Sequence, residues 1–211
     1  MGAFDTNGGN PLLIIGENLY IRRLKREDVD QLKHWGTHRD PLFETYNFPK
    51  TNERYRDYWY KEKQGKFFRR IFGVFLEDGR LVGYITLKSI RWIRKKAELG
   101  VVFDPKELDK GFGKEALEVF LHYWFRKKNF KEIYLIVGAF NKRAKKVYEN
   151  LGFVKEYECW ESFENPKITP EILQRVGYEE EFFKIYKEEV YCKYERMYIK
   201  PENIHNIHKK S

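Results

Sequence analysis

The stretch from Glu98 to Leu117 reads Glu-Leu-Gly-Val-Val-Phe-Asp-Pro-Lys-Glu-Leu-Asp-Lys-Gly-Phe-Gly-Lys-Glu-Ala-Leu. It opens with a short, β-branched apolar run at 99–103, which predicts a strand that ends at Asp104 and Pro105. After a loop with two glycines, apolar residues recur at the spacing of one helix face, as Leu117, Phe120, Leu121 and Trp124. The stretch therefore predicts a strand, a glycine-containing turn and the start of a helix.

The turn at Gly111 and Gly113 suits an anion, because the first N–H groups of a helix lack partners and the helix dipole favours negative charge there. Glycine lets a phosphate approach the backbone, and Lys110 and Lys114 add positive charge on either side. The pattern lacks the third glycine of a dinucleotide fingerprint and the ending of a P-loop. The turn by itself fits a phosphate site and a plain tight turn equally well.

Composition indicates a single folded domain outside a membrane. The chain has 211 residues, of which 42% are hydrophobic and 18% aromatic, and no apolar run approaches the roughly 20 residues of a membrane span. The polar N-terminus does not look like a signal peptide, so we expect a cytoplasmic protein with Cys159 and Cys192 reduced. The net charge of +9 fits an anionic cofactor, an acidic substrate, nucleic acid or simple solubility.

The rest of the chain predicts an α/β domain with a mixed sheet. Apolar runs on either side of the turn Asp78-Gly79 predict an antiparallel meander that leads into the strand at 97–103. The following helix and the strand at 133–137 complete a β-α-β unit, whose two strands should be parallel. We expect an N-terminal tail and lead-in at 1–17, one domain at 18–200 with an insertion at about 164–188, and a C-terminal tail at 201–211. No metal site is predicted, although His205 and His208 stand three apart in that tail.

Two motifs resemble the Gcn5-related N-acetyltransferases, the GNAT family. One is Gly111-Phe112-Gly113 with its flanking strand and helix. The other comprises Asn141, Ala144 and Tyr148, closed by Asn150-Leu151-Gly152-Phe153 at the family's spacing. The phrases Ile21-Arg22-Arg23-Leu24 and Ala97-Glu98-Leu99-Gly100 look like the RimJ/RimL-like branch, which acetylates ribosomal-protein N-termini and related amines. The resemblance covers roughly residues 18–164. It departs from the family at Leu108, where Gln or Arg is usual.

This resemblance implies an N-acetyltransferase that uses acetyl-coenzyme A as cosubstrate and a primary amine as acceptor, either a protein N-terminus or a small amine such as a polyamine. It implies a mostly antiparallel sheet with a central parallel pair splayed to bind coenzyme A, and helices on both faces. The cofactor-binding residues carried over from the family pattern are Val101, Val102, Phe103, Leu108, Asp109, Lys110, Gly111, Phe112, Gly113, Lys114, Asn141, Ala144, Lys145 and Tyr148.

Three residues are candidates for the chemistry, and each has a plainer interpretation. Glu98 is the candidate base, acting through water, or a solvated carboxylate paired with Lys95 or Lys96. Tyr148 is placed by the resemblance to protonate the coenzyme A thiolate, or it is a core tyrosine. Asn141 either only caps a helix or also bonds the pantetheine or a water.

The acceptor side is less specific in the sequence. The helix with Tyr55, Trp59 and Tyr60 either lines an acceptor cleft or packs on the sheet, and Glu44 and Glu62 could attract a polyamine. Lys142, Arg143 and Lys145 either bind adenosine phosphates or form a solvated helix face. Two alternative functions remain: a catalytically silent coenzyme A sensor, and a nucleic-acid module that uses the basic patch at 91–96. A homodimer through the tyrosine-rich last strand is a further prediction.

Overall fold

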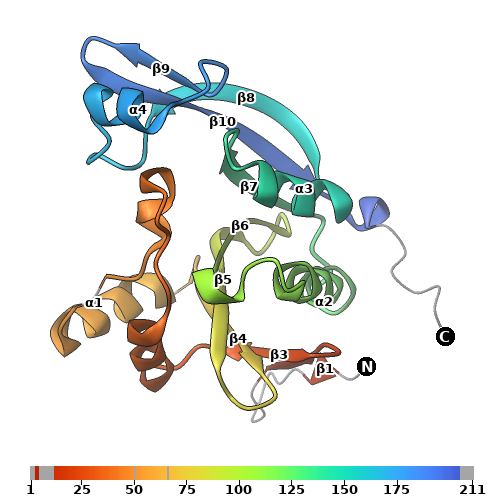
Figure 1. The fold of residues 1–211 in the computed structure, drawn as a ribbon. Coiled ribbons are helices and arrows are strands. Elements are labelled where there is room, and N and C mark those ends of the chain that lie inside the picture. The colour runs from red at the N-terminus through yellow and green to blue at the C-terminus, as the bar shows by residue number, and fades with distance from the viewer. Residues whose placement is uncertain (1–2, 5–11, 50, 66, 205–211) are drawn as a thin grey trace. The chain divides into compact units, whose positions relative to one another are not determined.

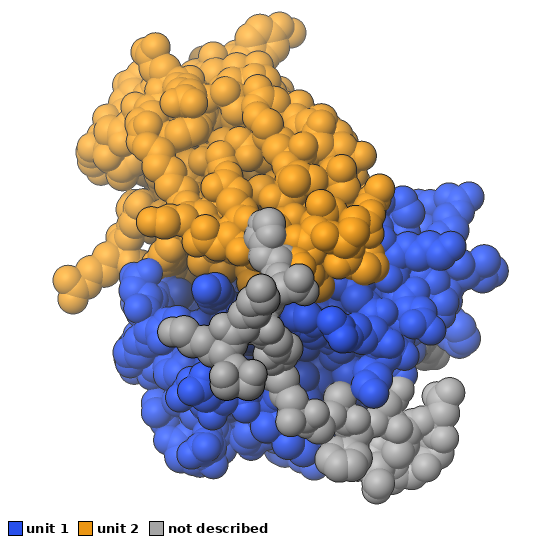
Figure 2. Space-filling view, turned by 90° about the vertical axis from the view of Figure 1, so that its right-hand side faces the viewer, with its two compact units in different colours: residues 1–37, 48–133 blue, residues 38–47, 134–211 orange. Residues whose placement is uncertain are grey.

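The computed structural model describes residues 3–4, 12–49, 51–65 and 67–204. The chain forms two compact units, residues 1–37 with 48–133 (unit 1) and residues 38–47 with 134–211 (unit 2), which Figure 2 shows in blue and orange. The domain predicted at 18–200 contains parts of both units. Figure 1 labels the elements used below.

Unit 1 is an antiparallel sheet in which each strand pairs with the next one along the chain. A turn at Gly79, whose φ is +82°, joins β4 to β5 as the Asp-Gly pair predicts. The strands are β1 (Ala3–Phe4), β2 (Leu13–Ile15), β3 (Leu19–Arg23), β4 (Arg70–Leu76), β5 (Leu81–Arg91) and β6 (Lys96–Phe103).

Helices cover both faces of this sheet, as predicted. β4 is buried on both sides, so its side chains enter two layers in alternation. Phe72 meets Phe120 of α2 (Phe112–Arg126) at 5.1 Å between ring centroids. Ile71 and Phe75 instead pack with residues of the 3₁₀ helix η1 (Glu27–His34), and Trp59 of α1 (Glu53–Gln64) borders that cluster.

Unit 2 is built around the long strand β10 (Glu189–Ile199), which is antiparallel to β8 (Val154–Ser162) and to β9 (Phe183–Tyr186). β7 (Glu132–Gly138) lies next to β10 in the strand order. The helical elements of unit 2 are η2 (Pro41–Tyr46), α3 (Lys142–Asn150), α4 (Pro170–Val176) and the short 3₁₀ turn η4 (Pro201–Asn203). Unit 1 has one further 3₁₀ turn, η3 (Pro105–Glu107). Phe43 of η2 packs on Phe140, with 5.3 Å between ring centroids.

Two expectations for unit 2 change. β10 has strand neighbours on both sides, so it offers no free edge to the last strand of a second copy, and the homodimer itself stays a prediction. The insertion at 164–188 contains a helix and β9, which was missed. Its hairpin turn uses Lys187 and Glu188, both with positive φ, where Asn or Gly usually signals such a turn. The fold is nevertheless mixed α/β and dominated by antiparallel pairs, and β6, α2 and β7 follow in the predicted order.

Candidate functional site

The start of α2 is an open helix N-terminus. Gly111 occupies the N-cap position with a φ of +87°, a conformation that favours glycine, and no side chain accepts a hydrogen bond from the first turn at this cap. Most helices fill these positions with a Ser, Thr, Asp or Asn side chain. The free N–H groups and the helix dipole therefore form a site for a negatively charged group.

Empty space lies around this turn among the described residues. A Cβ built on Gly111 would meet no atom within 4 Å, and a Cβ on Gly113 would meet only the ring of Phe103, at 3.6 Å or more. Packing within the described chain therefore does not require glycine at position 113. The pair fits a pyrophosphate that approaches the backbone from outside, because a side chain there would occupy that approach.

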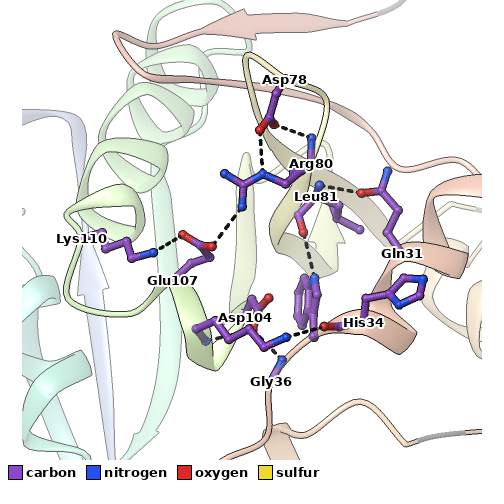
Figure 3. Close-up of polar contacts among 11 residues, drawn as sticks. Gln31, His34, Gly36, Asp78, Arg80, Leu81, Asp104, Glu107 and Lys110 are labelled. Atoms are coloured by element: carbon purple, nitrogen blue, oxygen red, sulfur yellow. Dashed lines mark hydrogen bonds and ion pairs between the residues drawn. The ribbon is translucent and has the colours of Figure 1, made fainter.

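The charged residues of the turn are partly engaged. The Lys110 ammonium lies 2.8 Å from Oε2 of Glu107, an ion pair shown in Figure 3. Lys114 in the first turn of α2 is exposed. Leu108 and Phe112 are half-buried, and Asp109 has a φ of +63°. Positive charge and backbone donors therefore occur together in this loop, while Leu108 contributes only its backbone.

Glu98 and Val102 lie on one face of β6, because side chains alternate along a strand. The Glu98 carboxylate lies 3.4 Å from the Lys88 ammonium of β5, and 22% of its side chain is exposed. The partner expected for Glu98 was Lys95 or Lys96, which is wrong: register places Lys88 directly opposite Glu98, and Lys96 pairs with Glu132. Glu98 is therefore held by an ion pair yet remains accessible to water.

Tyr84 of β5 is paired with Val102, so its side chain lies on the same face of the sheet as Glu98 and Val102. Tyr84 is the centre of an aromatic cluster on that face. Its ring lies 5.9 Å from Trp35 and 5.4 Å from Trp59, and burial raises its pKa. Trp59 and Tyr60 border the core cluster, as the packing interpretation predicted, whereas Tyr55 and Tyr58 of the same helix are exposed. The same face of the β5–β6 strand pair therefore presents both the aromatic ring of Tyr84 and the carboxylate of Glu98. On the other face, Val101 is half-buried and Phe103 is buried.

The remaining predicted residues belong to α3 in unit 2. The Asn141 side chain accepts a hydrogen bond from the Ala144 N–H at 3.1 Å, so its capping role is confirmed. Lys145 lies 2.8 Å from the buried carboxylate of Glu195, and Lys142 lies 2.8 Å from Glu179. The cationic side of α3 is therefore engaged in ion pairs with distant parts of the chain.

Tyr148 is half-buried, and its ring centroid lies 5.6 Å from that of Phe153. Among the residues that the structure describes, none forms a hydrogen bond with its hydroxyl. Burial raises the pKa of Tyr148 to about 12, so the hydroxyl keeps its proton at neutral pH. A protonated phenol with an unused donor is suited to donating a proton.

The contacts that hold the segment 104–107 to the rest of unit 1 were not predicted from the sequence. The buried Asp104 accepts from the Gly36 N–H at 2.8 Å, and Lys106 donates to the His34 carbonyl at 2.9 Å. Figure 3 shows these contacts beside the pair of Arg80 and Glu107. The only signal in the sequence was an Asp-Pro pair, which indicates a turn but not its partners.

Metal-binding clusters and membrane-spanning helices are both absent from the described part of the chain. It holds no cluster of three or more His, Cys, Asp or Glu side chains arranged for a metal ion. His205 and His208 lie outside the described residues. No described helix combines the length and apolar character needed to cross a membrane.

Comparisons with known proteins identify the family. Residues 18–154 match the model of the acetyltransferase (GNAT) domain. The spermidine N(1)-acetyltransferase of Vibrio cholerae is 28% identical over 156 residues, which are 71% of this chain and 86% of the relative. That of Escherichia coli is 31% identical over 86 residues, 41% of this chain and 46% of the relative.

The fold agrees with solved structures. The spermidine N-acetyltransferase of Vibrio cholerae in complex with CoA and spermine superposes with a TM-score of 0.65 at 24% identity, covering 88% of this chain and 97% of that one. Neither the sensor nor the nucleic-acid module is supported. The chain belongs to the GNAT acetyltransferase family and is an N-acetyltransferase that takes its acetyl group from acetyl-coenzyme A.

Proposed function

We propose that the acceptor amine belongs to a polyamine such as spermidine. The observation that carries this proposal is the set of relatives named spermidine N(1)-acetyltransferase, one of which is matched over 86% of its length. A ribosomal-protein N-terminus is the competing acceptor. A putative ribosomal N-acetyltransferase of Bacillus subtilis is 22% identical to this chain. The polyamine therefore has the stronger support.

The start of α2 binds the pyrophosphate of acetyl-coenzyme A. Backbone N–H groups from Leu108 to Lys114 donate to the phosphate oxygens, and Lys110 and Lys114 supply positive charge. An N–H of Val101 or Val102 polarises the thioester carbonyl. The open space around Gly111 and Gly113 supports this assignment, because it leaves the backbone accessible from outside.

Proton transfers are assigned to two side chains. A primary ammonium with a pKa near 10.4 must lose its proton before it attacks, and Glu98 takes that proton through water. The amine nitrogen then bonds to the acetyl carbon, and the carbon–sulfur bond breaks. Tyr148, whose pKa is raised to about 12, gives its proton to the departing thiolate. The second proton of the nitrogen passes through water to the Tyr148 phenolate, which restores the phenol, and the products are an N-acetyl amine and free coenzyme A.

The face with Glu98 and Tyr84 has the chemistry that a polyamine needs. A carboxylate attracts a chain of ammonium groups, and aromatic rings accommodate both its cations and its methylene segments. Trp59 and Tyr84 provide such rings. Glu44 is already paired with Lys167 at 2.6 Å, whereas Glu62 is exposed at the end of α1. Glu62 is therefore the better candidate of the two to attract the acceptor.

The test is an acceptor screen followed by thiol release from acetyl-coenzyme A. Spermidine and spermine should be acetylated with a kcat/KM at least about tenfold above that for peptides with a free N-terminus, because discrimination by one recognised charge has that size. Mass spectrometry of the product identifies the acetylated amine. Faster acetylation of N-terminal peptides would overturn the polyamine assignment while keeping the enzyme class.

We also propose that the protein works in the cytoplasm. Cys159 and Cys192 are free thiols, which suits a reducing compartment. A homodimer stays a prediction.

A further inference from the structure

A chain of ion pairs runs from the β4–β5 hairpin to the glycine turn of unit 1. Asp78 accepts from Arg80 Nε at 2.7 Å, Arg80 Nη1 lies 3.2 Å from Glu107 Oε1, and Lys110 Nζ lies 2.8 Å from Glu107 Oε2. Figure 3 shows Glu107 between the two cations, with one oxygen directed to each. Glu107 thus shares its charge between a hairpin residue and a residue of the anion-binding loop.

Glu107 is the enclosed member of this chain. Its side chain is 10% exposed, against 58% for Arg80 and 52% for Lys110. The hydrogen bond and charge of Lys110, with the charge of Arg80, hold the pKa of Glu107 below its usual range, so it is a carboxylate at neutral pH. An enclosed negative charge so close in sequence to an open helix N-terminus opposes the binding of another anion unless it is neutralised.

Arg80 is fixed in place before any ligand arrives. Its own N–H also donates to Asp78, at 3.0 Å, so both its backbone and its guanidinium are tied to one carboxylate. Gln31 secures the same turn by accepting from the Leu81 N–H at 2.9 Å and donating to the Gly79 carbonyl. An arginine held in this way loses little further freedom when it pairs with Glu107.

Lys110, in contrast, has a choice of partners. It lies next to Gly111, and its half-exposed ammonium can turn from Glu107 towards a bound phosphate. If Glu107 had only Lys110, this exchange would leave an enclosed carboxylate without a cation, which is costly. With Arg80 present, Glu107 keeps one cation throughout.

We propose that Arg80 is a positioning residue for acetyl-coenzyme A, which neutralises Glu107 and so releases Lys110 to the pyrophosphate. This inference rests on the proposed role of the α2 N-terminus. It assigns a function to a hairpin residue that lies outside both family motifs. Arg80 acts through Glu107 and does not itself touch the cosubstrate.

The test is a double-mutant cycle read by coenzyme A titration calorimetry and by steady-state kinetics. R80Q should raise the Kd for coenzyme A and the KM for acetyl-coenzyme A about 5- to 10-fold, the size of one partly screened charge interaction, with kcat unchanged. E107Q should lower both values about twofold, because a repulsive charge is removed. The double variant R80Q/E107Q should bind at least as well as the wild type. R80K serves as the control, since it keeps the charge, and should recover most of the affinity.

The outcomes separate the inference from the function it rests on. A double variant as weak as R80Q would mean that Arg80 does not act through Glu107, and unchanged binding by R80Q would mean that it does not act at all; each overturns the inference alone. A drop in kcat with KM unchanged would also overturn it. Wild-type protein that fails to bind coenzyme A overturns the proposed function together with the inference.

Discussion

The two helices that follow β6 and β7 begin in opposite ways. α2 begins at Gly111, with no side-chain cap on its first N–H groups, whereas α3 begins at Asn141, whose side chain accepts from the Ala144 N–H at 3.1 Å. In a capped helix, a backbone N–H of the first turn already donates to a side chain of the same chain. In an uncapped helix, the N–H groups of the first turn can donate to a ligand. The difference fits the proposal that α2 binds the pyrophosphate through its backbone and that α3 acts through its side chains.

The largest effect should come from Tyr148→Phe. Removing the proton donor should lower kcat about 100-fold, near the lower end of general-acid contributions, with the KM for acetyl-coenzyme A nearly unchanged. Because burial raises the pKa of Tyr148 to about 12, its hydroxyl is protonated below that pH and should add no falling limb to the rate profile up to about pH 10. Stopped assays of thiol release measure both. An unchanged kcat for Tyr148→Phe would show that Tyr148 of α3 is not the proton donor.

Gly113→Ala should separate binding from stability at the open helix. The new methyl group meets only Phe103 at an ordinary distance, and alanine is the better helix residue, so stability should rise by about 0.5–1 kcal/mol. The same methyl group occupies the approach of the pyrophosphate, so the Kd for coenzyme A should rise about 30-fold. Thermal melting and calorimetry on one sample measure both. Tight binding by this variant would show that the cosubstrate does not use this turn.

Glu98→Gln tests whether unit 1 only binds or also moves protons. A base that acts through water can be replaced in part by solvent, so we expect a loss of about tenfold in kcat and a flattened rising limb of the pH–rate profile. Lys88→Met is the matched control, because it removes the ion-pair partner of Glu98 and keeps the carboxylate. If the pH–rate profile of Glu98→Gln rises like that of the wild type, Glu98 is not the general base.

The smallest effect is expected for the cap of α3. Asn141→Ala should cost about 1 kcal/mol of folding free energy, and Asn141→Ser should retain most of it because serine also caps helices. Chemical denaturation of both variants measures the difference. If Asn141→Ser is stable yet binds acetyl-coenzyme A several-fold more weakly, the asparagine also contacts the cosubstrate. The N-termini of α2 and α3 would then both take part in binding, in spite of their different caps.

The local features of this protein follow from its sequence alone. The turn at Gly79, the cap at Asn141 and the start of α2 at Gly111 are all set by residues a few positions apart, and all were predicted. The site residues could be named for the same reason, since both family motifs are short and continuous. β9 was not predicted, because Lys187 and Glu188 are not residue types that indicate a turn, although both adopt positive φ.

Only the tertiary structure decided which charges meet. Glu98 pairs with Lys88, Lys145 with Glu195, and Arg80 with Glu107, and the partners are 10, 50 and 27 residues apart in the sequence. The first pair depends on strand register, where a shift of one residue turns every side chain to the other face, and the other two depend on how a helix and a loop pack on the rest of their unit. The sequence alone therefore determined the family, the open turn and the cap, while the packing of distant strands and loops determined how each charged residue around them is held.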